Sequence, residues 1–264
     1  MNFRPGFLAQ EAKALLALCN HAQWEGEESP CSHEHLPPLP GHLRILSRIQ
    51  LAGRELGLVF GQCAPHTYVL VIRGRTYTPL SIERDLEFRT LPARGFAGHE
   101  AGQVHAGFKD LLEVLLPQIL VCLEKIPAAR PFNLYVSGHG QGAALAALTC
   151  AFLGQHPFWQ TQIRLKSYFF GLPRVGNQYF AEEFDQRFSQ SGWSFRICHV
   201  RDVVPFLPLG PEVSCFEPSP MTHFLPVGQL ISLTSEFPSE ENNRDIFAWH
   251  GVRRYYRHLS AEYA

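Results

Sequence analysis

The chain has 264 residues, of which 45% are hydrophobic, and this size and composition suit an α/β domain with a substantial core. Its 23 Lys and Arg residues nearly balance its 24 Asp and Glu residues, for a formal net charge of −1. No basic run is present, so nucleic acid is not an expected partner, and no apolar stretch has the length needed to span a bilayer.

The N-terminal residues do not form a secretory signal, because Pro5, Gly6, Glu11 and Lys13 interrupt any apolar core of such a segment. The seven cysteines are odd in number and irregularly spaced, with no C-x-x-C pair, which favours buried, reduced thiols. We therefore expect a cytoplasmic location, although a mature form that has lost its signal also fits. The sequence gives no indication of the oligomeric state.

Hydrophobic periodicity predicts strands that alternate with helices along the chain. A helix is expected over residues 7–19, and a polar, Pro-rich loop over 20–42. Strands are expected over residues 56–60, 67–72, 132–136, 165–170, 195–200 and 229–233. Helices are expected over residues 107–126, 141–153, 178–188 and 245–264, and a Gly-rich loop over 90–103.

This alternation predicts a mainly parallel central sheet flanked by helices on both faces. No repeat or linker divides the chain, so we expect a single domain over 1–264, with residues 1–50 supplying an N-terminal helix and the Pro-rich loop. Within that loop, His33-Glu34-His35 has no third ligand at a recognisable spacing. We interpret it as solvated loop and expect no metal site.

Residues 134–148 contain a nucleophile elbow without its nucleophile. An apolar strand runs into Gly138-His139-Gly140-Gln141-Gly142, and an Ala/Leu-rich helix follows at once. A serine hydrolase has G-x-S-x-G at such a strand-to-helix turn, and here Gly140 takes the place of the serine. The later glycine and acidic residue of a dinucleotide loop are missing, as is the Gly-Lys-Ser/Thr of a phosphate loop. The pattern therefore indicates acyl-ester chemistry.

Two further residues stand where a hydrolase triad needs them. The chain order in α/β-hydrolases is Ser, then Asp, then His. Asp202 follows the strand expected over 195–200, and His250 lies at a late loop or at the start of the last helix. Each residue alone would be interpreted as a turn or surface residue, but their order after the elbow favours a triad. The apolar pair Phe206 and Leu207 are candidate substrate-binding residues.

Several segments, over roughly residues 55–260, match a known family in order. They are Val71-Ile-Arg-Gly, Val104-His-Ala-Gly-Phe, the elbow, Phe170-Gly-Leu-Pro-Arg-Val-Gly-Asn, Asp202-Val-Val-Pro-Phe-Leu-Pro, and His250 with Tyr255 and Leu259. On these motifs the chain resembles the class 3 lipases, the family of the fungal triacylglycerol lipases and their bacterial and plant relatives. The resemblance implies an α/β-hydrolase fold, no cofactor, and lipid or other acyl-ester substrates of lipase or phospholipase type, with peripheral contact to a lipid surface.

The resemblance also implies roles for single residues. Asp202 orients the imidazole of His250, which acts as general base and then as acid, and Gly140 holds the nucleophile position. The backbone N–H of Gln141 is the first oxyanion-hole donor, and the second follows Arg73-Gly74 in the sequence, at either Arg75 or Thr76. The family has Trp where this chain has Ile82, so the lid region differs. His139 is expected to support the turn, and Ser137 to point away from His250.

The missing serine leaves two interpretations of the chain. It is a lipid acyl-ester hydrolase inactivated at Gly140, either by deliberate replacement or in a natural pseudoenzyme. An intact Asp202 and His250 favour replacement, whereas the altered oxyanion segment and Ile82 favour natural loss. Alternatively, the chain is a non-catalytic lipid- or protein-binding module on the same fold.

Overall fold

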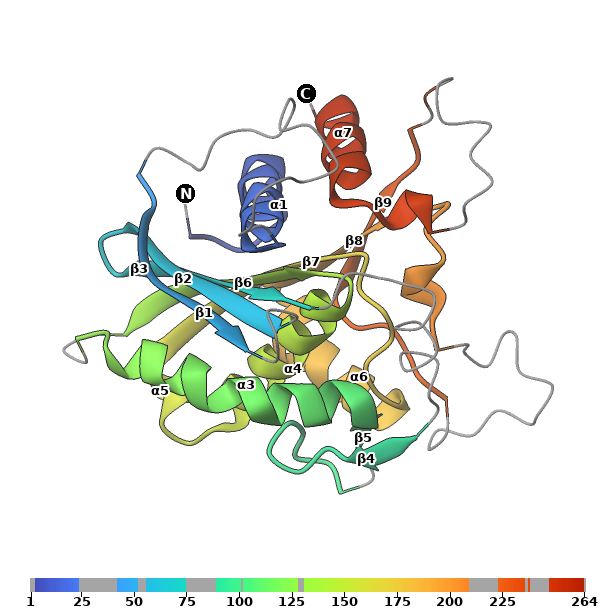
Figure 1. Cartoon of the computed structure of the whole chain (residues 1–264). Helices are drawn as coiled ribbons and strands as arrows, with labels where there is room; N and C mark the ends of the chain where they lie inside the picture. Colours follow the sequence, from blue (N-terminus) through green and yellow to red (C-terminus); the bar gives the residue numbers. More distant parts are fainter. Residues whose placement is uncertain are drawn as a thin grey trace.

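A seven-stranded sheet in the order β1-β2-β3-β6-β7-β8-β9 forms the centre of the molecule (Figure 1). The computed structural model describes residues 3–23, 42–51, 56–74, 89–100, 102–127, 131–208, 223–235, 237 and 247–263. The strands are β1 Arg44–Leu51, β2 Leu56–Ala64, β3 Thr67–Arg73, β6 Phe132–His139, β7 Ile163–Phe170, β8 Ser194–His199 and β9 Gln229–Leu233. The pairs β1–β2 and β2–β3 are antiparallel, and every later pair is parallel, as the alternation of elements predicted.

Helices cover both faces of this sheet. Helices α1 (Ala9–Gln23) and α7 (Val252–Glu262) lie on one face, above the sheet in Figure 1. The opposite face carries α3 (Ala106–Glu124), α4 (Gln141–Gln155), α5 (Trp159–Gln162) and α6 (Gln178–Phe184). This arrangement confirms the expected α/β-hydrolase architecture.

Strand β3 shows why the sheet needs both layers. Successive side chains of a strand point to opposite faces, and Val69 and Val71 pack under α1 while Leu70 and Ile72 pack against α4. All four are buried. Strands that are apolar on both sides, rather than alternating, are typical of parallel sheets with two helical layers.

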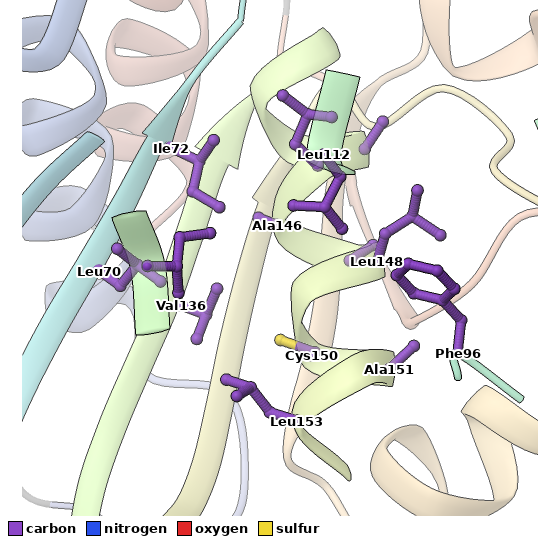
Figure 2. Packing of buried hydrophobic residues seen from close by; sticks show 14 of the residues in the cluster. Leu70, Ile72, Phe96, Leu112, Val136, Ala146, Leu148, Cys150, Ala151 and Leu153 are labelled. Carbon is purple, nitrogen blue, oxygen red and sulfur yellow. The ribbon is translucent and has the colours of Figure 1, made fainter. Parts of the chain in front are cut away.

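Helix α4 is buried on nearly all of its surface, which explains its all-round apolar sequence. Its small side chains, such as Ala146 and Cys150, lie close to Ile72 and Val136 of the sheet in Figure 2. On the other side of α4, Leu112 of α3 closes the layer. The N-terminus of this tightly packed helix is the elbow, so the packing fixes the position of residue 140.

A buried charged cluster attaches α1 to the sheet. The Glu11 carboxylate accepts hydrogen bonds from the ammonium of Lys166 at 2.7 Å and from the hydroxyls of Tyr135 at 2.5 Å and Tyr168 at 2.7 Å. Both members of the ion pair are buried. A buried carboxylate is tolerated only with such partners, so this cluster fixes the position of α1 over β6 and β7.

Some element bounds differ from the sequence-based expectations. Helix α1 continues to Gln23, so residues 20–23 are helical rather than loop, and α7 begins at Val252 rather than at 245. Residues expected as a plain Gly-rich loop contain β4 (Thr90–Pro92), which pairs with β5 (Gln103–His105). The edge strand β1 was not predicted; its positions alternate between exposed and half-buried, and the exposed ones include Arg44, Leu46 and Arg48. A π-helical turn, Asp185–Ser189, replaces the last turn expected after α6.

Within the described residues, five cysteines are free thiols and four of these are buried, as the sequence predicted. Burial raises the pKa of the Cys150 thiol to about 12, which makes it unreactive. No described helix combines the length and apolar character required to cross a bilayer. The same part of the chain contains no group of three or more metal-ligating side chains, and the His33-Glu34-His35 motif lies outside it.

Candidate functional site

The turn between β6 and α4 has the backbone of a nucleophile elbow. Gly140 has φ 56° and ψ −124°, a conformation that L side chains adopt only under strain. Its N–H donates to Phe170 O at 2.9 Å, and its carbonyl accepts the N–H of Ala143 at 2.9 Å. The turn is therefore fixed from both sides, and a side chain at position 140 would stand at the carboxyl ends of the central parallel strands.

Two residues from distant parts of the chain meet at this edge of the sheet. Asp202 lies just after β8, and His250 ends a single 3₁₀ turn, Ala248–His250, directly before α7. Asp202 Oδ2 and His250 Nδ1 are 2.7 Å apart, and both residues are buried. Nδ1 donates to the carboxylate, so the ring is held in one orientation with its other nitrogen, Nε2, as the basic atom.

The Asp202 carboxylate is held ionised by several donors. Its Oδ2 also accepts the hydroxyl of Tyr255 at 2.5 Å, and its Oδ1 accepts the N–H of Val204 at 2.9 Å. Burial alone would raise the pKa of Asp202, but the charge of His250 and these hydrogen bonds outweigh it and hold the pKa below its ordinary value. Tyr255 matches the family motif, but its contact with Asp202 was not predicted. Its hydroxyl also accepts the N–H of His199 at 3.3 Å.

His139 packs against the imidazole of His250. The two ring centroids are 4.3 Å apart, and the ring of Tyr255 lies 5.7 Å from that of His139. Burial and the neighbouring charge of His250 lower the pKa of His139 to about 3, although Asp202 partly opposes this effect. His139 is therefore neutral at ordinary pH and supports the site by packing.

Gly171 lies directly under the Asp202–His250 pair, a role that the sequence motif did not reveal. Its φ is 56°, and a Cβ at this position would lie 2.6 Å from His250 Cε1 and 3.1 Å from Asp202 Oδ2. A side chain here would displace the imidazole. The glycine of Phe170-Gly-Leu-Pro is therefore needed for close approach of the histidine.

The structure describes the first predicted oxyanion-hole donor but not the second. Gln141 is the first residue of α4, where backbone N–H groups point out of the helix end. A Cβ on Gly74 would lie 2.7 Å from Cβ of Gln141, so the segment after β3 begins directly beside the elbow. Arg75 and Thr76 lie outside the described residues, as does Ile82.

The apolar candidates Phe206 and Leu207 differ in how exposed they are. Phe206, at the end of the 3₁₀ turn Val204–Phe206, is 53% exposed, and Leu207 is half-buried. Phe96 of the Gly-rich segment is buried against Phe152, with ring centroids 6.0 Å apart, so it belongs to the core. Ser137 is fully buried and donates to Tyr168 O at 2.7 Å, so it cannot replace the missing nucleophile.

Comparisons with known proteins point to one family. The sequence model of the family described as Lipase (class 3) matches residues 69–211. A secreted mono- and diacylglycerol lipase from Fusarium solani is 35% identical over 214 residues, which cover 78% of this chain and 58% of that protein. A lipase from Caenorhabditis elegans is 43% identical over 207 residues, which cover 75% of this chain and 55% of that protein.

The fold is also that of a solved lipase structure. Lipase II from Rhizopus niveus superimposes with a TM-score of 0.66 and 20% identity, over 94% of this chain and 92% of that chain. The chain thus spans between half and two thirds of the sequence relatives that it matches, but almost the whole of this structural relative. The cytoplasmic location expected from the N-terminal residues is contradicted by these comparisons, because the Fusarium solani relative is a secreted enzyme.

Proposed function

Because this chain belongs to the class 3 lipase family, we propose that its site is that of a lipid acyl-ester hydrolase in which Gly140 takes the place of the nucleophilic serine. One observation carries the proposal: Asp202 and His250 form a buried pair at 2.7 Å, at the same sheet edge as the strained turn that holds Gly140. A residue that served only as a surface turn or cap would not need this arrangement.

Each residue has one role in the proposed reaction. With a hydroxyl at position 140, His250 would take its proton as the oxygen attacks the ester carbonyl, and Asp202 would stabilise the imidazolium. The N–H of Gln141, together with that of Arg75 or Thr76, would stabilise the negative oxygen of the tetrahedral intermediate. These steps need no cofactor. Exposed Phe206 and neighbouring Leu207 would contact the acyl chain or a lipid surface.

Gly140 removes the covalent step of this reaction. Deleting the nucleophile of a comparable triad lowers kcat by about 10⁶-fold, and binding and oxyanion effects account for what remains. We therefore propose that the chain binds acyl esters but does not form an acyl-enzyme. A non-catalytic binding module on this fold is the alternative, and the experiment below separates the two.

The test restores the hydroxyl with a matched control. Gly140→Ser should hydrolyse p-nitrophenyl esters at a rate several orders of magnitude above the parent chain. Gly140→Ala adds the same Cβ without the oxygen and should stay at the parent rate. His250→Ala in the Gly140→Ser background should abolish the gain. A folded Gly140→Ser protein that is inactive on acyl chains of every length would favour the binding module instead.

A further inference from the structure

A cavity of about 500 Å³ lies at the end of the sheet opposite the Asp202–His250 pair. Ile163 and Leu165, at the start of β7, line it together with Gly154 in the last turn of α4. The Asp202–His250 pair lies instead at the carboxyl ends of the parallel strands. The volume falls in the range of small-molecule sites, about 300–1,000 Å³. The cavity is therefore a candidate binding site of its own.

One backbone edge of β7 faces this cavity without a neighbouring strand. The pairing of β7 with β8 begins only at Ser167, whose N–H donates to Trp193 O at 2.8 Å. Alternate residues of a strand direct their N–H and C=O to the same side. Leu165 therefore directs its N–H and C=O toward the side of β8, where the described part of the chain places no paired strand residue. This edge offers a ligand one hydrogen-bond donor and one acceptor.

Arg187 joins the lining from the π-helical turn Asp185–Ser189. The turn is fixed by Asp185 Oδ1, which accepts the N–H of Gly228 at 2.8 Å. The Arg187 guanidinium donates to Gly154 O, at the C-terminal end of α4. Because a guanidinium has several N–H donors, this bond uses only part of its capacity. Arg187 is thus held at the cavity with donors left for a ligand.

The charged side chains of the lining are both positive. Arg187 and the exposed Arg164 line the cavity, and no acidic residue does. Among the residues that the structure describes, no ion pair neutralises either arginine. The C-terminal end of α4 contributes a partial charge of about −0.5, which two guanidinium charges exceed. The cavity of a chain with a net charge of −1 therefore favours an anion.

Much of the remaining lining is apolar. Phe188 is buried and Trp193 is half-buried, and they join Ile163 and Leu165 around the cavity. Trp193 packs against Phe3, with ring centroids 5.2 Å apart, so its indole is held in place. A small inorganic anion would leave this apolar surface in contact with water, whereas an apolar chain would cover it. The lining therefore suits a ligand with an acidic head and an apolar body.

We propose that this cavity binds a carboxylate with an apolar chain, at a site separate from the one at Gly140. The carboxylate pairs with Arg187, with the N–H of Leu165 as a further donor, and the chain lies on Phe188 and Trp193. Hydrogen bonds between a guanidinium and a carboxylate are charge-assisted, and therefore stronger than those between neutral groups. No step of ester hydrolysis takes place here, so the proposal stands apart from the proposed function.

Isothermal titration calorimetry with octanoate tests the site, and acetate and octanol serve as probes that lack the chain or the charge. We expect saturable binding of octanoate, and binding at least ~10-fold weaker for acetate and for octanol. Arg187→Gln should weaken octanoate binding by about 10–150-fold, which corresponds to the loss of one hydrogen bond between charged groups. Arg44→Gln, at an exposed residue of the edge strand β1, should leave binding unchanged.

Arg164→Glu provides a second variant if Arg187→Gln does not fold, because Arg164 is exposed. Reversal of its charge should weaken octanoate binding at least ~3-fold at low ionic strength.

The outcomes separate this inference from the proposed function. Octanoate binding that Arg187→Gln and Arg164→Glu both leave unchanged would overturn it, as would the absence of measurable binding to the parent chain. Equal affinity for acetate or for octanol would also overturn it, because the site would then not recognise charge and chain together. Inactivity of folded Gly140→Ser beside octanoate binding that depends on Arg187 would contradict the proposed function alone.

Discussion

Gly140→Ser should lower the stability of the protein, because the turn imposes a backbone that serine adopts only with strain. At φ 56° and ψ −124°, a non-glycine residue costs about 1–3 kcal/mol. Loss of glycine's larger unfolded-state entropy offsets about 0.4–1 kcal/mol of this cost. The net loss is therefore between about 0 and 2.6 kcal/mol. A chain of this size loses about 2–4 °C in Tm per kcal/mol, so Tm should fall by up to about 10 °C.

Gly251 provides a matched control for the same substitution. It is the N-cap of α7, as Gly140 is of α4, but its φ of −65° and ψ of 134° suit any residue. A Cβ there would meet only Ala248 O, at 3.6 Å. Gly251→Ser should gain a few tenths of a kcal/mol from capping and about 0.4–1 kcal/mol from the unfolded state. The two variants should thus shift ΔG of unfolding in opposite directions.

The assay is urea and thermal unfolding of the parent chain and both variants in one buffer. A Tm of Gly140→Ser clearly above that of the parent would refute the reasoning. Position 140 would then be unstrained, and the turn would not be a nucleophile elbow.

Three other substitutions test separate parts of the structure. Gly171→Ala should lower the free energy of unfolding in urea by about 2–5 kcal/mol. Residue 171 has φ 56°, and its Cβ would lie 2.6 Å from the ring of His250. A loss under ~1 kcal/mol would show that the imidazole can move aside. The pKa of His139 is lowered from 6.5 to about 3 in the folded chain. Below pH 6.5 the unfolded chain therefore binds a proton that the folded chain does not. The free energy of unfolding then falls by about 1.4 kcal/mol for each pH unit as pH falls. His139→Asn should therefore remove about 2 kcal/mol of the stability difference between pH 7 and pH 5, and equal slopes for the two proteins would contradict this. Glu11→Gln should lower the free energy of unfolding by about 3–5 kcal/mol, because Lys166 then stays buried beside a neutral amide. A loss below ~1 kcal/mol would show that the ion pair is dispensable.

The features that the sequence predicted are those encoded locally. The elbow is a contiguous motif between an apolar strand and an apolar helix, and the structure places its turn at Gly140. The parallel sheet follows from the alternation of elements, which needs no knowledge of contacts. The order of Asp202 and His250 after the elbow favoured pairing them, and in the structure Asp202 Oδ2 and His250 Nδ1 lie 2.7 Å apart.

The features that the sequence did not predict depend on packing between distant elements. The Glu11–Lys166 pair joins residues 155 positions apart, and a charged residue in an amphipathic helix is normally assigned to its solvent face. Tyr255 of α7 contacts Asp202, which follows β8, and His139 at the end of β6 contacts His250, which precedes α7. No spacing rule connects these residues, so only the folded chain reveals the contacts.

Active-site labelling tests most directly whether position 140 is the nucleophile position served by His250. A p-nitrophenyl alkylphosphonate reacts covalently with an activated serine and releases one nitrophenolate for each site. Mass spectrometry of the digested protein should find one adduct per chain in Gly140→Ser, on the peptide that contains residue 140. The parent chain and Gly140→Ser with His250→Ala should carry none at that position. A folded Gly140→Ser protein without the adduct, or an adduct that forms equally fast without His250, would contradict the account.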